Sequence, residues 1–166
     1  MTINISGKVD EEMFNKFITF FNENLQNQKI IYFSSSGGST DIAEACIDLI
    51  NSNKQNTTLI AYNKLYSSGF DIFFKSKCNR HILENSIGMY HQRHLDVSVN
   101  ENIKPIWKED KCKIAFQKIQ KIKTIEFCKN LNFSINNLKL IKKGNDVWFQ
   151  NIELQKMLKH SDSPNV

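Results

Sequence analysis

The stretch that decides the fold is KIIYFSSSGGST, residues 29–40, which joins a run of strand-forming side chains to a glycine turn. The isoleucine, tyrosine and phenylalanine side chains at residues 30–33 favour a buried β-strand. Gly37 and Gly38 end that strand, and Ser39 begins the polar run that caps a following helix. Backbone N–H groups at such a turn are oriented to receive a phosphate or the oxyanion of an acyl-transfer intermediate, although a glycine pair before a helix is also an ordinary structural turn.

The same strand-then-helix pattern occurs on both sides of this stretch. TINIS, residues 2–6, is typical of a short strand that stops at Gly7, and the helix after it has an apolar stripe. Downstream, TTLIAY at residues 57–62 predicts a further strand, followed by a helix that begins near Ser67 or Ser68. This βαβαβα order predicts an α/β fold with a largely parallel sheet covered by helices. The first stripe comprises Met13, Phe14, Phe17, Ile18, Phe21 and Leu25.

The second half of the chain predicts shorter strands and longer helices. Two short strands are expected in RHIL and SIGMY, near residues 80–90. One helix is predicted over residues 106–129 and another over residues 151–159. We therefore expect one domain over residues 1–160 and a flexible polar tail over residues 161–166. The apolar face of the longer helix comprises Cys112, Ala115, Ile119, Ile122 and Ile125.

Composition excludes several classes of function. The 166 residues carry a net charge of +5, but only Arg80 and Arg93 among the 22 basic residues are arginines, which argues against specific nucleic-acid recognition. No apolar run approaches the roughly 20 residues that span a bilayer, and the first residues lack a leader pattern, so no membrane association is expected. The cysteines form no C-x-x-C pair, which argues against a disulfide framework and favours a cytoplasmic location.

Two kinds of side chain with catalytic potential follow predicted strands. Ser67 and Ser68 lie in YSSG at a strand-to-helix turn, where a serine hydroxyl either faces a cleft or simply caps the helix. His91 follows SIGMY directly, where an imidazole acts as a general base or as a satisfied core histidine. His91 and His94 form H-x-x-H, but the companion ligands of a zinc site are missing, so we expect no metal and no cofactor.

Taken in order, these motifs resemble the proteolytic subunit of the Clp protease, a serine peptidase with the Clp/crotonase-like fold. The resemblance covers residues 1 to about 158. IIYFSSSGGS is similar to that family's strand ending in Asn-Ser-Pro-Gly-Gly, YSSGF to its Ala-Ser-Met-Gly-Ala segment, and MYHQ to its Met-Ile-His-Gln. NDVWFQNIEL is similar to the family segment in which an aspartate precedes an aromatic residue and a helix. The chain has Ser36 and Arg93 at positions where the family has proline.

The resemblance implies βαβ-type repeats with a protruding handle helix at residues 106–129, and a serine endopeptidase that cleaves unfolded proteins or peptides. In that chemistry a serine attacks the peptide carbonyl, a histidine moves its proton, and an aspartate holds the imidazole. An extended substrate would add as a strand beside the segment after Gly38 and the segment near His91. The implied residues are catalytic Ser67, His91 and Asp146, the oxyanion-hole N–H groups of Gly38 and Ser68, and substrate-binding Gly37, Ser39 and Gln92.

The resemblance further implies a homo-oligomeric ring. A Clp ATPase partner is a further implication, but this chain begins almost at its first strand, whereas family members carry an N-terminal segment that contacts the ATPase ring, which argues against docking. Two other functions also stay open: a catalytically silent structural or regulatory subunit, and a crotonase-type acyl-thioester enzyme. The presence of Ser67, His91 and Asp146 argues against the acyl-thioester enzyme, because such enzymes need no serine nucleophile.

Overall fold

The computed structural model describes residues 1–23, 27–92 and 107–162. The chain forms two compact units. Unit 1 comprises Met1–Tyr90 with Val147–Val166, and unit 2 comprises His91–Asp146. The expectation of one domain over residues 1–160 stays a prediction.

Unit 1 is built on one six-stranded sheet, with strand order β1-β2-β3-β5-β6 and β4 paired to β3. β3 pairs with β4 through Thr58–Ala61 and with β5 through Lys64–Tyr66, so two short strands share one edge of a long strand. β6 pairs antiparallel with β5, and the other pairings are parallel, as the alternating pattern predicted. The strands are β1 Thr2–Val9, β2 Lys29–Gly38, β3 Thr57–Tyr66, β4 Asn79–Ile82, β5 Ile87–Tyr90 and β6 Val147–Phe149.

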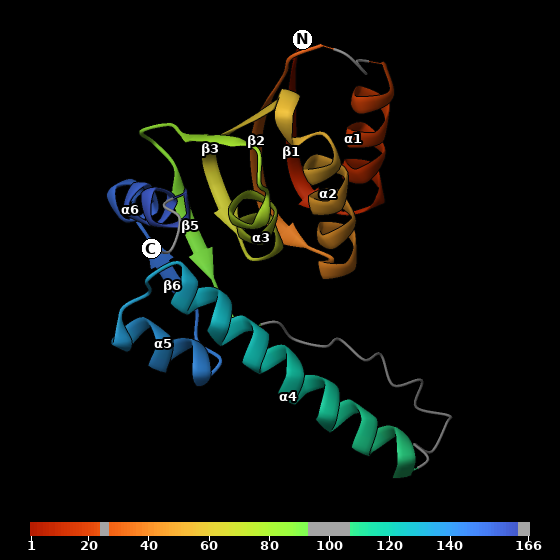
Figure 1. Cartoon of the computed structure of the whole chain (residues 1–166). Helices are drawn as coiled ribbons and strands as arrows, with labels where there is room; N and C mark the ends of the chain where they lie inside the picture. Colours follow the sequence, from red (N-terminus) through yellow and green to blue (C-terminus); the bar gives the residue numbers. More distant parts are fainter. Residues whose placement is uncertain (24–26, 93–106, 163–166) are drawn as a thin grey trace. The chain divides into compact units, whose positions relative to one another are not determined.

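Helices cover one face of this sheet. Figure 1 shows α1, α2 and α3 side by side along the strands, and these neighbouring helices contact one another. α6 packs on the same face, because Leu154 of α6 and Phe70 of α3 both meet Gly88 of β5. No helix among the described residues is long and apolar enough to cross a membrane. The helices of unit 1 are α1 Glu11–Glu23, α2 Thr40–Ser52, α3 Ser68–Lys75 and α6 Asn151–Asp162, with a 3-10 turn, η1, at Lys54–Asn56.

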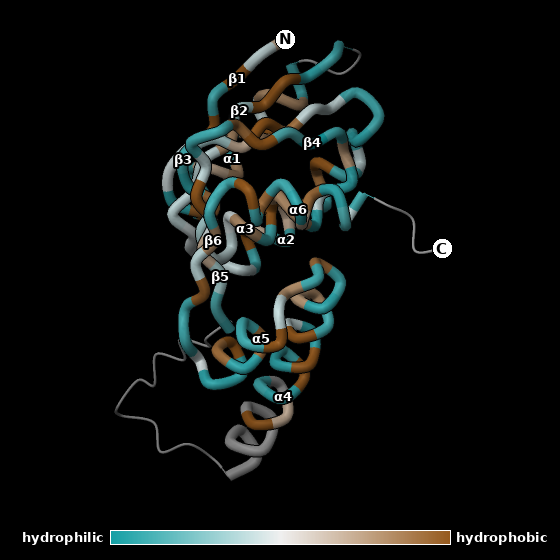
Figure 2. Tube along the Cα trace, turned by 90° about the vertical axis from the view of Figure 1, so that its left-hand side faces the viewer, coloured by the Kyte–Doolittle hydropathy of each residue, from teal (hydrophilic) through white to brown (hydrophobic). Residues whose placement is uncertain are grey.

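The core of unit 1 lies between these helices and the sheet. Figure 2 shows hydrophobic residues along the strands and helices and hydrophilic residues in many of the connecting turns. Phe17 of α1 and Phe33 of β2 are fully buried with their rings 6.3 Å apart. Burying each such ring contributes about 1.5 to 3 kcal/mol. Phe20 joins the predicted stripe of α1, whereas Leu25 lies outside the described residues.

The described part of unit 2 contains two helices, α4 Trp107–Asn130 and α5 Ile135–Lys142. α4 matches the predicted helix, and two residues of its predicted apolar face, Ile119 and Ile122, are 51% and 52% exposed. Among the side chains of α4 that the structure describes, those of Thr124 and Cys128 are buried, near the end that continues toward α5. A lysine-rich helix of 24 residues offers apolar positions that the short α5 does not cover. The side chain of Cys112 lies outside the described residues.

Several element boundaries differ from the predictions. β2 continues through Gly37 and Gly38, because these residues still pair with the end of β1. α6 continues to Asp162, into the stretch predicted as a tail, and residues 163–166 lie outside the described residues. The sequence patterns predicted neither α5 nor the three-residue β6.

Candidate active site

Ser67 occupies the turn between β3 and α3 in an unusual backbone conformation. Its dihedral angles are φ 51° and ψ −119°, outside the regions that an L-residue ordinarily adopts. A serine side chain that caps a helix accepts a hydrogen bond from the first turn, but Ser67 makes no such bond to α3. The capping interpretation of Ser67 is therefore wrong. A strained strand-to-helix turn of this kind presents a serine hydroxyl at the edge of a sheet.

Glycines let neighbouring backbone approach this turn closely. A Cβ atom at Gly37, where φ is +86°, would lie 2.8 Å from Cβ of Ser67 and 2.9 Å from the carbonyl oxygen of Tyr66. Gly69, near the start of α3, is packed against Ser35 of β2, where an added Cβ would lie 2.5 Å from the serine Cβ. The end of β2 is thus in direct contact with the Ser67 turn. A larger residue at either glycine would push the strand and the turn apart.

Ser35 holds the end of β2 in place. Its hydroxyl donates a 2.9 Å hydrogen bond to the carbonyl of Gly7 and accepts a 3.1 Å bond from the backbone N–H of Gly37. One residue beyond Gly38, the backbone N–H of Ser39 donates to the carbonyl of Val9, and the Ser39 hydroxyl caps α2. This role of Ser35 was not predicted, although a serine two positions before a glycine pair is a visible signal for such a support.

His91 and Asp146 lie together because of the pairing of β5 and β6. Tyr90 pairs with Val147 in the antiparallel register, so the residue after Tyr90 and the residue before Val147 emerge next to each other. Nδ1 of His91 lies 3.4 Å from Oδ1 of Asp146. Both side chains are partly exposed, at 27% and 50%. The structure thus brings together two of the three residues assigned to the triad.

The Ser67 turn is joined to β5, the strand that leads into His91. The backbone N–H of Ser67 donates a 2.8 Å hydrogen bond to the carbonyl of Met89, which lies two positions before His91. Ser68 begins α3 and is buried, and no described residue offers its hydroxyl a hydrogen bond. Gln92 is half-buried and follows His91 directly.

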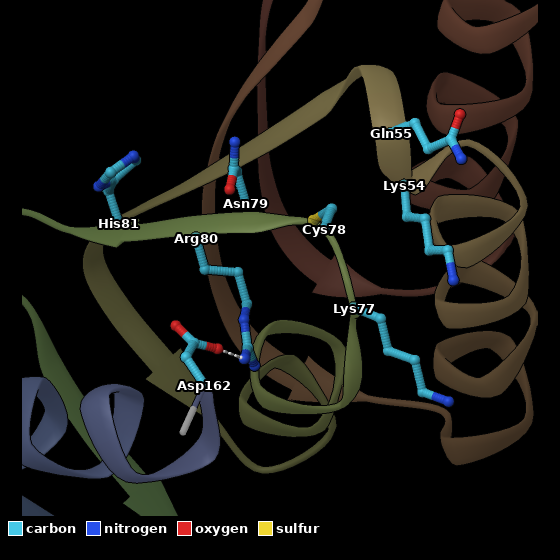
Figure 3. Close-up of a pocket in the computed structure, with 8 residues that line it drawn as sticks. All are labelled: Lys54, Gln55, Lys77, Cys78, Asn79, Arg80, His81 and Asp162. Carbon is cyan, nitrogen blue, oxygen red and sulfur yellow. Dashed lines mark hydrogen bonds and ion pairs between the residues drawn. The ribbon is translucent and has the colours of Figure 1, made fainter. Parts of the chain in front are cut away.

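A cavity of about 630 Å³ lies elsewhere in unit 1 and contains none of the assigned site residues. In Figure 3 the side chains of Arg80 and Asp162 point toward each other and form an ion pair. Arg80 also donates a 2.8 Å bond to the carbonyl of Phe74 and a 3.1 Å bond to Ser161, so it joins the ends of α3 and α6. These contacts hold two helix ends together, so Arg80 has a structural role. The lining residues are Lys54, Gln55, Lys77, Cys78, Asn79, Arg80, His81 and Asp162.

Comparisons with known proteins place this arrangement in a fold class. Among solved structures, the chain is similar to the ClpP1 N165D mutant from Listeria monocytogenes, with a TM-score of 0.69. The match covers 94% of this chain and 86% of that chain, at 17% sequence identity. No sequence-family profile and no curated protein matches the chain. The likeness shows a ClpP-like α/β fold, and the predicted fold class is confirmed.

Proposed function

We propose that the chain is a serine-type endopeptidase that cleaves unfolded proteins or peptides. The observation that carries this proposal is the strained conformation of Ser67, at φ 51° and ψ −119°, on a turn that makes no helix-capping bond through its hydroxyl. A serine that only caps a helix does not need this conformation, whereas a nucleophile on a sharp strand-to-helix turn does. The ClpP-like fold supports a peptidase in general terms.

In the proposed reaction, the Ser67 hydroxyl attacks the peptide carbonyl and His91 accepts its proton. His91 then donates that proton to the leaving amine, and water hydrolyses the acyl-enzyme by the same steps. Asp146, 3.4 Å from Nδ1 of His91, orients the imidazole and stabilises the imidazolium. The backbone N–H groups of Gly38 and Ser68 bind the oxyanion, and the loss of one such donor raises the barrier by about 3 to 4 kcal/mol.

The substrate lies extended along the end of β2 in this proposal. Gly37 and Gly38 end β2, Ser39 follows them directly and Gln92 follows His91, so the proposal places the added substrate strand beside these residues. Main-chain pairing suits a peptidase that accepts varied polypeptides, because it does not depend on the substrate's side chains. This binding mode requires no metal and no cofactor.

The proposed assembly is a homo-oligomeric ring. The lysine-rich helix α4 has exposed apolar side chains at Ile114, Ile119 and Ile122. A second copy of the chain could bury these side chains in an interface. Sedimentation velocity across the micromolar range tests this assembly. A stable monomer throughout that range contradicts it, and faster-sedimenting species that depend on concentration support it.

Labelling with a fluorophosphonate probe tests the proposed activity. Wild-type protein is expected to label, Ser67→Ala to lose all labelling, and His91→Ala to label at least about 10³-fold more slowly. Ser68→Ala is the matched control, because it deletes the adjacent hydroxyl yet keeps the backbone N–H, and it is expected to label. Absence of wild-type labelling favours a catalytically silent subunit, and acyl-thioester binding without serine labelling favours the crotonase-type function.

A further inference from the structure

A buried carboxylate lies one helical turn beyond the Ser67 turn. Asp71 of α3 is 1% exposed and stands among aromatic side chains in the run SSGFDIFF. The Tyr90 hydroxyl donates a 3.2 Å hydrogen bond to Oδ1 of Asp71, and Nζ of Lys75 lies 3.2 Å from the same oxygen. Lys75 in turn lies 3.5 Å from Glu44 of α2. One polar chain therefore connects α2, α3 and the last residue of β5.

The two ends of the Tyr90–Asp71 bond are attached directly to the candidate catalytic residues. Tyr90 immediately precedes His91 in the chain. The backbone N–H of Asp71 donates a 3.1 Å hydrogen bond to the carbonyl of Ser67. Together with the bond from the Ser67 N–H to the Met89 carbonyl, this gives the Ser67 turn two connections to the end of β5.

We infer that the Tyr90–Asp71 hydrogen bond is a positioning contact that fixes the end of β5, and with it the point where the chain enters His91, against the Ser67 turn. This inference rests on the proposed function for its catalytic consequence. Packing alone does not require the polar pair, because the Tyr90 ring already lies 5.0 Å from the Phe70 ring and a phenylalanine would keep that contact. Removing a carboxylate from water costs free energy. The hydrogen bond and the ion pair of Asp71 offset part of that cost only when the side chains keep one arrangement.

Hydrogen exchange tests the contact independently of activity. Tyr90→Phe removes only the hydroxyl, and the protection of the Ser67 amide is expected to fall by about tenfold beyond any fall at the amide of Ile31, which lies in the interior strand β2. Tyr62→Phe is the matched control: it removes a tyrosine hydroxyl that donates to Asn4 at 2.7 Å, away from the site. In Tyr62→Phe, any fall in the protection of the Ser67 amide is expected to equal the fall at the Ile31 amide. If Tyr90→Phe lowers the protection of the Ser67 and Ile31 amides by the same factor, the inference is overturned.

The rate of fluorophosphonate labelling tests the catalytic consequence. Tyr90→Phe is expected to lower the maximal inactivation rate by about tenfold with little change in the probe concentration at half-maximal rate, since geometry and not probe binding is altered. Asp71→Asn retains an acceptor oxygen for Tyr90 and is expected to label within about threefold of wild type, whereas Asp71→Leu is expected to match Tyr90→Phe. An unchanged labelling rate in Tyr90→Phe, despite lost Ser67 protection, also overturns the positioning role.

The two arms separate the failure of the inference from the failure of the proposed function. If wild-type protein does not label, the proposed peptidase activity fails, and the Ser67 exchange rate in Tyr90→Phe still decides whether the contact holds the turn. If wild-type protein labels and Ser67 protection is unaffected by Tyr90→Phe, the positioning inference fails while the peptidase proposal stands.

Discussion

Replacement of Gly37 by alanine should damage the Ser67 turn more than it damages the fold. The new methyl group would lie 2.8 Å from Cβ of Ser67 and 2.9 Å from the Tyr66 carbonyl, and neither neighbour is the end of a flexible side chain. Positive φ costs an L-residue about 1 to 2 kcal/mol, and overpacking adds about 1 to 3 kcal/mol. We therefore expect Gly37→Ala to lower the free energy of unfolding by about 2 to 5 kcal/mol.

Two other glycines provide controls for this substitution. Gly144 has φ +81°, close to the +86° of Gly37, and Gly7 of unit 1 has φ +123°, and an added Cβ at either meets nothing within 4 Å. Gly144→Ala and Gly7→Ala thus carry backbone strain without a clash. Urea unfolding followed by circular dichroism gives the energies, and fluorophosphonate labelling gives the reactivity. If Gly37→Ala labels as fast as wild type and loses no more stability than the controls, the close approach of β2 to Ser67 is refuted.

Two further predictions concern stability. Arg80→Ala is expected to lower the free energy of unfolding by about 2 to 4 kcal/mol, because it leaves the partly buried carbonyls of Phe73 and Phe74 without their donor. Lys16→Ala, which breaks an exposed i,i+4 pair, should cost under about 0.5 kcal/mol in the same urea titration. Burial raises the pKa of the Cys46 thiol from 9.0 to about 12, so the unfolded chain releases this proton first and stability falls as the pH rises above 9. Cys46→Ala should lessen that fall by up to about 1.4 kcal/mol per pH unit, and equal slopes in urea titrations of both proteins would show that the thiol is not buried.

The regular alternation of strands and helices was predictable from side-chain periodicity. The stripe of α1 reports burial directly, because burial spaces its apolar residues. The apolar run at residues 30–33 instead alternates, with Ile31 and Phe33 buried and Tyr32 exposed. β6 is too short for any periodicity, and its pairing depends on β5 at a distance in the chain. α5 had a visible signal in Ser134, whose hydroxyl caps the helix by accepting from the Asn137 N–H.

Only the residue types of the candidate site and their order along the chain could be predicted from the sequence. Ser67, His91 and Asp146 were identified from motif order, but the turn of Ser67, with its positive φ, contacts Gly37 and Met89, which lie far away in the sequence. Asp71 was a visible anomaly, an acid in an aromatic run, yet its partner Tyr90 could be known only from the packing of α3 against β5. Local patterns report burial, whereas contacts between distant segments decide geometry.

The central claim is that Ser67 is the activated nucleophile, and tandem mass spectrometry of the fluorophosphonate-treated protein tests it most directly. We predict a single phosphonyl group on the peptide that contains YSSGF, localised to Ser67 and formed at least about 10³-fold more slowly in His91→Ala. A group localised to Ser68 or to a serine in another peptide, or equal modification of Ser67 when His91 is replaced, would contradict the account.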